Sequence, residues 1–476
     1  MTTGSTSATT PEAVIRRAAS LRDTLSRGFR DEAVRSLYAE ASRIADRATV
    51  RDGARLDIDQ RIDALVTSPI LGLPIMALLL AIVFWLTVAG ANVPSAMLAS
   101  VLLDWAHPLL KGAADAVMPW WLSGLLVDGM YLATAWVISV MLPPMAIFFP
   151  LFTMLEDFGY LPRVAFNLDR TFRRVGAHGK QALTMAMGWG CNAAGVVAAR
   201  IIESPRERLI AIITNNFALC NGRWPTQILV ASIFVGGVAP AHLAGMVSAL
   251  AVVGVAVLGV VLTFVTSWVL SRTVLRGEVS AFSLELPPYR PPRVFATLYT
   301  SLIDRTLYVL WRAIVFALPA GALIWLVSNV PWGDVSMAEA LIHWMQPFGG
   351  LIGLSGVILL AYVVAIPANE IVVPTILMLT VLVSRVHGVG GGAGVMFELD
   401  SAADTAALLR GSGWTLLTAV CLMLFSLVHN PCSTTIFTIW KETRSVKWTT
   451  LSALLPVVMG FLLCFVVAQS WRLVAG

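Results

Sequence analysis

Residues 242–270 read HLAGMVSALAVVGVAVLGVVLTFVTSWVL, a run that contains no Asp, Glu, Lys or Arg. A helix needs about 20 mostly apolar residues to cross the hydrocarbon core of a bilayer. Five other stretches of comparable length also lack charged side chains: those between Asp63 and Asp104, Asp128 and Glu156, Arg312 and Asp334, Glu339 and Glu370, and Arg410 and Lys441. The sequence therefore predicts a polytopic membrane protein.

The composition supports this class and excludes others. Of the 476 residues, 57% are hydrophobic and 13% are charged, against about 25% charged in a soluble domain. Backbone groups in lipid must be paired internally, so spans are helices or closed barrels, and these runs lack the alternation of barrel strands. We predict an all-α fold. We assign the net charge of +5 to cytoplasmic loops and expect no nucleic-acid partner. Five cysteines in apolar stretches argue against an extracellular disulfide scaffold.

Charge also divides the chain, because the first 68 residues hold 21 of its 61 charged residues. We predict a cytoplasmic helical segment at 1–66 and a membrane domain at 67–476 with about eight full spans. Two parts of that domain, about 130–271 and 306–476, each contain short apolar segments interrupted by Gly, Pro or Asn. This pattern is typical of transporters with two pseudo-repeated gate halves and a midplane site between discontinuous helices.

The loops beginning at Arg163 and Arg272 are rich in basic residues. Such loops lie on the cytoplasmic side by the positive-inside rule. We therefore expect a multi-pass protein whose N-terminus is cytoplasmic and whose first partner is the lipid bilayer.

One interrupted segment joins Met187, Gly190, Cys191 and Asn192. Glycines on both sides of Trp189 allow the backbone to unwind, which turns carbonyls and helix ends toward a cation. Thiol, thioether and amide oxygen together suit a borderline transition-metal ion such as Fe²⁺ better than Na⁺ or Mg²⁺. Although a buried cysteine is ordinarily inert packing, this context predicts a place on an ion pathway.

A second segment contains Asn216, Cys220 and Arg223. Cys220 follows Asn216 by four residues, one helical turn along the same face. Because Arg223 would repel a cation, we place it at a gate; the alternative is an arginine that reaches toward the lipid headgroups.

Two further breaks lie in the second half. Asn369 precedes Glu370, whose carboxylate at membrane depth is either protonated or paired with a cation. Glu370 is thus predicted to be a ligand or a proton-coupled switch, the alternative being an ion pair with an arginine at the membrane edge. His429 and Cys432 lie three residues apart around Pro431, which interrupts helical hydrogen bonding. Imidazole and thiol together make a reasonable transition-metal site.

Nothing in the sequence predicts an enzyme. The GxxxxGK[ST] phosphate loop is missing from this chain, and the apolar runs hold no Ser–His, paired-Asp or HExxH arrangement. A GTPase, if used, would act from a separate chain.

Several motifs, in order, resemble the membrane domain of the FeoB family of bacterial ferrous-iron transporters over about 55–475. They are Pro150–Phe166, Gly188–Asn192, Arg200–Arg208, Glu285–Arg290, Asn369–Glu370, Asn430–Cys432 and Lys441–Thr443. The resemblance implies an inner-membrane permease that moves Fe²⁺ inward. It also implies that the family's pathway cysteines correspond to Cys191, Cys220 and Cys432, and its intramembrane acid to Glu370.

The chain departs from the family pattern in several places. The family usually carries an amino-terminal GTP-binding domain, so the resemblance implies either a G domain on a separate polypeptide or operation without one. Asn369 stands where a lysine is common, and His429 and Asn430 stand where Tyr-Thr is common. Because these changes alter the ligands, metal preference could have moved to Mn²⁺, Co²⁺ or Zn²⁺.

We therefore predict a transporter of a divalent transition metal, Fe²⁺ first, with no permanently bound cofactor. Cys191, Cys220, Glu370, His429 and Cys432 would bind or gate the ion. Alternatives are another divalent metal, a small solute, or a non-transporting regulatory membrane protein. A separate G protein, a small cytoplasmic regulator and a second copy of the chain are the partners considered.

Overall fold

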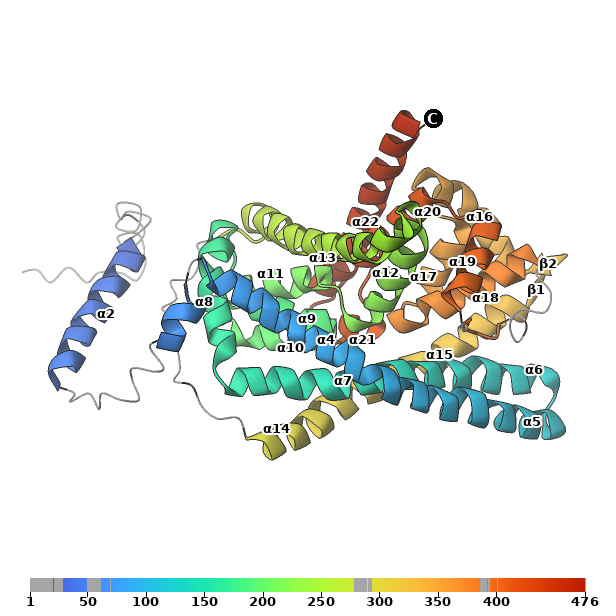
Figure 1. Cartoon of the computed structure of the whole chain (residues 1–476), viewed down its shortest axis with the longest axis horizontal. Helices are drawn as coiled ribbons and strands as arrows, with labels where there is room; N and C mark the ends of the chain where they lie inside the picture. The colour runs from blue at the N-terminus through green and yellow to red at the C-terminus, as the bar shows by residue number, and fades with distance from the viewer. Residues whose placement is uncertain are drawn as a thin grey trace, which may run out of the picture.

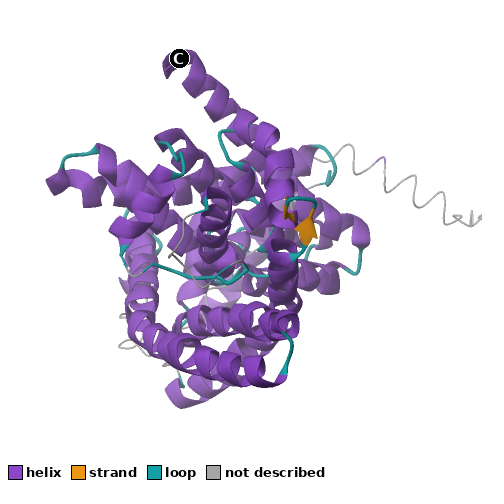
Figure 2. Ribbon diagram, turned by 90° about the vertical axis from the view of Figure 1, so that its right-hand side faces the viewer, coloured by secondary structure: helices purple, strands orange, loops and turns teal. Residues whose placement is uncertain are grey.

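A computed structural model describes residues 29–48, 61–68, 70–277, 293–385, 394–399 and 401–475, together with Ser20, Tyr289 and Gly392. The predicted cytoplasmic segment 1–66 is covered only in part: α2 (Phe29–Ala48) is helical, and the rest up to residue 60, apart from Ser20, lies outside the described residues. The described chain is helical almost throughout, and its two strands, β1 (Pro331–Trp332) and β2 (Val335–Ser336), form a short hairpin visible in Figure 2. The predicted all-α fold is confirmed.

Six described helical segments are long and apolar enough to cross a bilayer: Gly72–Val117, Trp120–Asp157, Ala241–Arg272, Val294–Asn329, Leu416–Thr443 and Val446–Val474. A seventh is obtained if α16 (Met337–Leu351) and α17 (Gly356–Val364), which meet at 112°, count as one span. The sequence predicted about eight, plus or minus two, together with half-helices. The structure has the lower number among its described residues because the polar breaks divide apolar runs into helices too short to span alone.

The remaining elements follow in chain order. The first hairpin contains α4 (Gly72–Ala99), η1 (Ser100–Ala106), α5 (His107–Val117), α6 (Trp120–Ser123), η2 (Gly124–Tyr131) and α7 (Leu132–Asp157). Then come α8 (Tyr160–Arg174), α9 (Gln181–Gly190), α10 (Asn192–Ala198), η3 (Ala199–Ile201), α11 (Pro205–Thr214), η4 (Asn215–Phe217), η5 (Asn221–Arg223), α12 (Trp224–Val230), η6 (Ala231–Val235), η7 (Gly236–Val238) and α13 (Ala241–Arg272). The second half contains α14 (Val294–Thr300), η8 (Ser301–Leu307), α15 (Tyr308–Asn329), α16, α17, η9 (Asn369–Ile371), α18 (Val372–Ser384), α19 (Ala402–Gly411), α20 (Leu416–Val428), α21 (Ser433–Thr443) and α22 (Val446–Ala475).

The first hairpin is longer than a bilayer requires. Its arms have 46 and 38 residues, and at about 1.5 Å per residue the longer one reaches about 69 Å. Figure 1 shows α4 and α7 side by side, with α5 and α6 at the far end. The returning arm packs closely on α15, since a Cβ atom at Gly321 would lie 2.2 Å from the Gly129 carbonyl oxygen. Small residues permit this approach of two helix backbones.

A cluster of polar side chains, called the clasp below, joins three segments that are distant in the sequence, those around Asp63, Arg163 and Tyr289. The guanidinium of Arg163, only 1% exposed, donates from Nε to Asp63 Oδ1 at 2.9 Å, and Tyr289 donates its hydroxyl to the same oxygen at 2.8 Å. The Arg163 guanidinium also stacks 4.0 Å from the centre of the Tyr289 ring. Partial burial raises the pKa of Asp63, but the hydrogen bonds from Arg163 and Tyr289 outweigh it and hold the pKa below its ordinary value.

We expect Asp63→Asn to lower the free energy of unfolding by about 1–2 kcal/mol at pH 7, because Arg163 then lacks its charged partner. A depressed carboxyl pKa stabilises the fold at neutral pH, and this contribution disappears as the pH falls below the ordinary value of 3.8 toward the folded pKa. Thermal unfolding in detergent measures the effect. Glu203→Gln, at a side chain 85% exposed, is the matched control; an equal loss in both variants would contradict the clasp.

Candidate metal pathway at two helix breaks

Two helices break with the same backbone conformation. Cys191, between α9 and α10, has φ −149° and ψ 120°, and Ala368, between α17 and η9, has φ −149° and ψ 121°. In the first break Gly190 admits the ring of Phe148, which would lie 2.1 Å from a Cβ atom there. In each break the next residue is an asparagine, Asn192 or Asn369. Extended backbone at these points directs peptide groups away from the helices.

Each asparagine contacts a polar residue of the neighbouring break in its own half. The Asn192 amide nitrogen lies 3.3 Å from Asn216 Oδ1, and Asn369 Oδ1 lies 3.0 Å from His429 Nε2. Rotating the Asn192 amide by 180° instead lets it donate to Ala218 O at 3.2 Å and to Gly188 O at 2.9 Å. Either orientation ties the break at Cys191 to the polypeptide beside it.

A small cavity lies where the breaks of both halves meet. It has a volume of about 30 Å³, which is room for one or two water-sized species. It is lined by Met141, Met145, Gly190, Cys191, Asn192, Cys220, Asn221, Gly222, Ala313, Pro367, Ala368, Asn369, Glu370, Cys432, Thr434 and Thr435. The structure thus brings seven predicted site residues to one cavity: Gly190, Cys191, Asn192, Cys220, Asn369, Glu370 and Cys432.

Glu370 reaches this cavity by lying over a glycine of the other half. A Cβ atom at Gly222 would stand 2.3 Å from Glu370 Oε1 and 2.6 Å from its carboxyl carbon. Asn369, beside it, donates its amide hydrogen to Cys220 Sγ at 3.8 Å. The carboxyl group and one thiol are therefore positioned by contacts between the halves.

We expect Gly222→Ala to displace the Glu370 side chain and to reduce transport at least about fivefold, because an added methyl would overlap the carboxyl group. Overpacking a filled site typically costs about 1–3 kcal/mol. Gly254→Ala in α13, where a Cβ atom meets nothing within 4 Å, is the control. Cargo uptake into proteoliposomes measures both, and equal uptake by both variants would contradict this placement.

His429 lies behind the cavity, and it is not among the residues that line it. Its Nδ1 is 2.9 Å from Ser426 O, and its Nε2 faces Asn369 Oδ1. Both ring nitrogens are engaged, so in this arrangement the imidazole positions Asn369. Its predicted role as a ligand stays a prediction.

Arg223 is buried with 1% of its surface exposed and ties the two halves together. Its terminal nitrogens donate to Asn216 O at 2.9 Å, Asn216 Oδ1 at 3.1 Å, Leu427 O at 2.8 Å, His429 O at 3.3 Å and Asn430 O at 3.4 Å. Asn216 also donates its side-chain amide to His429 O at 2.9 Å. Together the two side chains satisfy the carbonyl groups freed where α20 ends.

Some residues fall outside the sequence expectation. Met187 lines a larger neighbouring vestibule and is not among the residues that line the cavity. Conversely, Met141 and Met145 line the cavity, and they were not among the residues predicted from the sequence. The sequence feature that could have identified these two methionines is the pair Pro143 and Pro144 between them, because prolines interrupt helical hydrogen bonding inside α7.

The cavity is not a ready-made metal site. Across the described part of the chain, no three His, Cys, Asp or Glu side chains are arranged to hold a metal ion. The lack of a tight metal site is compatible with an ion pathway, since an ion must be bound strongly enough to enter and weakly enough to leave.

Two protein families match parts of the chain. The Gate family, described as "Nucleoside recognition", matches residues 138–234 and 310–446, which contain all four breaks. The family "Ferrous iron transport protein B C terminus" matches residues 252–304. No solved structure shows a significant match to the chain.

Curated relatives extend the match to nearly the whole chain. A protein of Staphylococcus aureus named "Fe(2+) transporter FeoB" is 29% identical over 97% of this chain and 67% of its own length. A protein of the same name from Synechocystis is 27% identical over 86% of this chain and 62% of its own length. One from Salmonella typhimurium is 32% identical over 56% of this chain and 32% of its own length. The chain thus spans about two thirds of the first two relatives.

The fold is that of a polytopic helical membrane protein, and residues 138–234 and 310–446 are similar to the Gate family. Within that class, the chain is a homologue of the membrane domain of the FeoB family, which confirms the resemblance drawn from its motifs.

Proposed function

We propose that this protein is a permease that moves Fe²⁺ across the membrane into the cytoplasm through the cavity between the two halves. The observation that carries the proposal is the meeting of Cys191, Cys220, Cys432 and Glu370 around one small cavity, from breaks in both halves. The names of the relatives support ferrous iron as the cargo.

The chemistry of the lining favours a transition-metal ion. Three thiols and two thioethers are soft ligands, while Glu370 and the asparagine amides supply oxygen. Such a mixed set suits Fe²⁺ and its neighbours, whereas Mg²⁺ and Ca²⁺ prefer oxygen alone. An ionisable group at membrane depth is expensive and marks a pathway, so a carboxyl group at Glu370 fits an ion route better than packing.

The distribution of basic residues supports the direction of the pathway. Arg200 and Arg305 line one vestibule together with Leu161, which is two residues before Arg163, and Lys441, which is five residues before the start of α22. We assign the end with this vestibule to the cytoplasm by the positive-inside rule. The N-terminal segment is then cytoplasmic as well, where a G protein or a small regulator would reach it.

Uptake of Fe²⁺ into proteoliposomes tests the proposal, with ascorbate to hold the iron reduced. We expect uptake by the wild type and at least about a tenfold loss in Cys191→Ser and in Cys432→Ser. Cys421→Ala is the matched control, because Cys421 is fully buried between α20 and α22 and does not line the cavity. Equal uptake by all four proteins would overturn the assigned site, and competition by Mn²⁺, Co²⁺ or Zn²⁺ would reveal a changed preference.

The Gate match, described as nucleoside recognition, brings in a small organic solute as a second candidate cargo. The cavity volume of about 30 Å³ disfavours it, because sites for small organic ligands usually measure about 300–1,000 Å³. Failure of nucleosides to compete with Fe²⁺ is the expected result.

A further inference from the structure

A larger vestibule adjoins the cavity along the same two helices. Its volume is about 470 Å³. On α10 the cavity is lined by Asn192, and the vestibule by Ala193, Ala194, Val197 and Ala198. On α21 the cavity is lined by Thr434 and Thr435, and the vestibule by Thr438, Lys441 and Glu442. An ion leaving the cavity along α10 and α21 would therefore pass directly into the vestibule.

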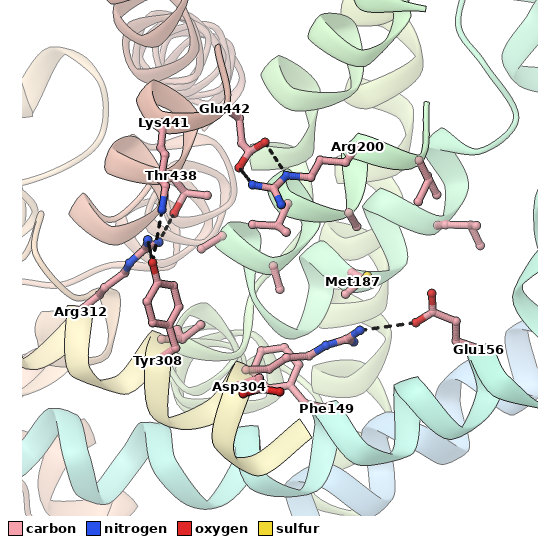
Figure 3. Close-up of a pocket in the computed structure, with 18 of the residues that line it drawn as sticks. Phe149, Glu156, Met187, Arg200, Asp304, Tyr308, Arg312, Thr438, Lys441 and Glu442 are labelled. Carbon is pink, nitrogen blue, oxygen red and sulfur yellow. Dashed lines mark hydrogen bonds and ion pairs between the residues drawn. The ribbon is translucent and has the colours of Figure 1, made fainter. Parts of the chain in front are cut away.

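Charged side chains gather at this vestibule, as Figure 3 shows. They are Glu156, Arg200, Asp304, Arg305, Arg312, Lys441 and Glu442. The surplus of basic groups, and the proximity of the basic loops, place the vestibule at the end that we assign to the cytoplasm.

One ion pair in the vestibule connects the two halves. Arg200 of η3 donates from Nε to Glu442 Oε2 at 2.8 Å and from Nη2 to Glu442 Oε1 at 2.6 Å. The two parallel bonds give the pair a defined geometry. Glu442 is only 10% exposed, while Arg200 is 59% exposed, so the arginine can leave toward solvent while the carboxylate stays.

The other contacts at the vestibule involve different elements, and Arg305–Glu156 joins η8 to α7. On the second half, Arg312 donates to Thr438 Oγ1 at 3.3 Å and to the Tyr308 hydroxyl, and Lys441 Nζ lies 3.5 Å from that hydroxyl. Arg305 lies 3.8 Å from Glu156. Neither group links α10 to α21, so Arg200–Glu442 is the ion pair among the vestibule-lining residues that joins these two walls.

We propose that the vestibule is the intracellular exit of the pathway and that the Arg200–Glu442 pair latches it shut. Breaking the pair removes the ion-pair restraint between α21 and η3, which also pack through Ile439 and Ala199, and this lets the exit open and leaves the Glu442 carboxylate to meet the departing divalent cation. The inference rests on the proposed function for the identity of the cargo and on the observed contacts for the latch.

Access to Cys432 from the cytoplasmic side tests the latch without measuring transport. Everted membrane vesicles containing the full chain are treated with a charged, membrane-impermeant methanethiosulfonate, and labelling of Cys432 is followed by mass spectrometry. We expect Arg200→Glu and Glu442→Arg each to label about two- to fivefold faster than the wild type. The double variant R200E/E442R restores the pair with reversed sign and should label at the wild-type rate.

Two controls make the result specific. Arg43→Glu breaks an exposed Arg43–Glu40 pair on α2 and should leave the labelling rate of Cys432 unchanged. Cys421 in the same molecules should stay unlabelled; if it labels together with Cys432, the pair supports the fold and the latch is overturned. Unchanged rates in the single variants, or no restoration in the double variant, also overturn it.

Fe²⁺ uptake by the same proteins separates the two proposals. A wild type that takes up no Fe²⁺ would refute the proposed function, whereas the labelling rates would still decide the latch.

Discussion

Replacing Glu370 by Gln is expected to reduce Fe²⁺ uptake at least about tenfold, with little change in the fold. Glu370 supplies the carboxyl group among the described residues that line the cavity. Gln keeps the size of the side chain over Gly222 but removes the charge that compensates a partly dehydrated cation. A loss of only about 1.4 kcal/mol of stabilisation corresponds to this factor.

Initial rates in proteoliposomes measure the effect, with Glu40→Gln on the exposed α2 helix as the control. Glu370→Asp should retain part of the activity because it keeps the carboxylate, although one methylene farther from the cavity. Wild-type uptake by Glu370→Gln would show that the ion does not depend on this group.

Replacing Arg223 by Met is expected to give the largest loss of stability, about 3–5 kcal/mol, because buried carbonyl groups of both halves then lose their donor. Each hydrogen bond from a charged group contributes about 1.5–3 kcal/mol, and the relief of burying the Arg223 charge offsets part of the total. The stability of Arg223→Lys should lie between that of the wild type and that of Arg223→Met. An ammonium group lacks the planar guanidinium geometry and cannot reach all five oxygen atoms.

Thermal unfolding in detergent measures this series, with Arg272→Met as the control. Arg272 is exposed and stacks on Trp268 at 4.3 Å within its own helix. An Arg223→Met protein as stable as the wild type would contradict the role of Arg223 as a tie between Asn216 and the end of α20.

The membrane class and the cavity residues could be predicted from the sequence because both depend on local signals. An uncharged run such as 242–270 indicates a lipid environment by itself, since charged groups are costly in lipid wherever they occur. Cys191 and Glu370 were identified because each stands beside helix-breaking or polar neighbours in an otherwise apolar segment. That they meet at one cavity required the structure.

Residues whose role depends on a distant partner could not be predicted in the same way. Gly222 matters because the Glu370 side chain occupies the space that a Cβ atom would fill. Arg223 was expected near a gate, but its acceptors at Leu427 and His429 lie about two hundred positions away in the chain. The pairing of His429 with Asn369 likewise follows from packing between segments.

The length of the first hairpin also could not be predicted from the local sequence. The sequence marked an uncharged stretch that ends before Asp104, whereas the structure continues one helical segment from Gly72 to Val117. Asp128 lies 2.8 Å from Lys111 Nζ and 3.0 Å from His107 Nε2 across the hairpin, so polar groups in this stretch have partners on the other arm that the local sequence does not show.

Anomalous X-ray scattering at the iron edge, from crystals of the protein loaded with Fe²⁺ under reducing conditions, tests the central claim most directly. An anomalous peak inside the cavity bounded by Cys191, Cys220, Glu370 and Cys432, and absent from Cys191→Ser crystals, is the predicted result. Iron bound only elsewhere, with the cavity empty at saturating Fe²⁺, would contradict a metal pathway through the helix breaks.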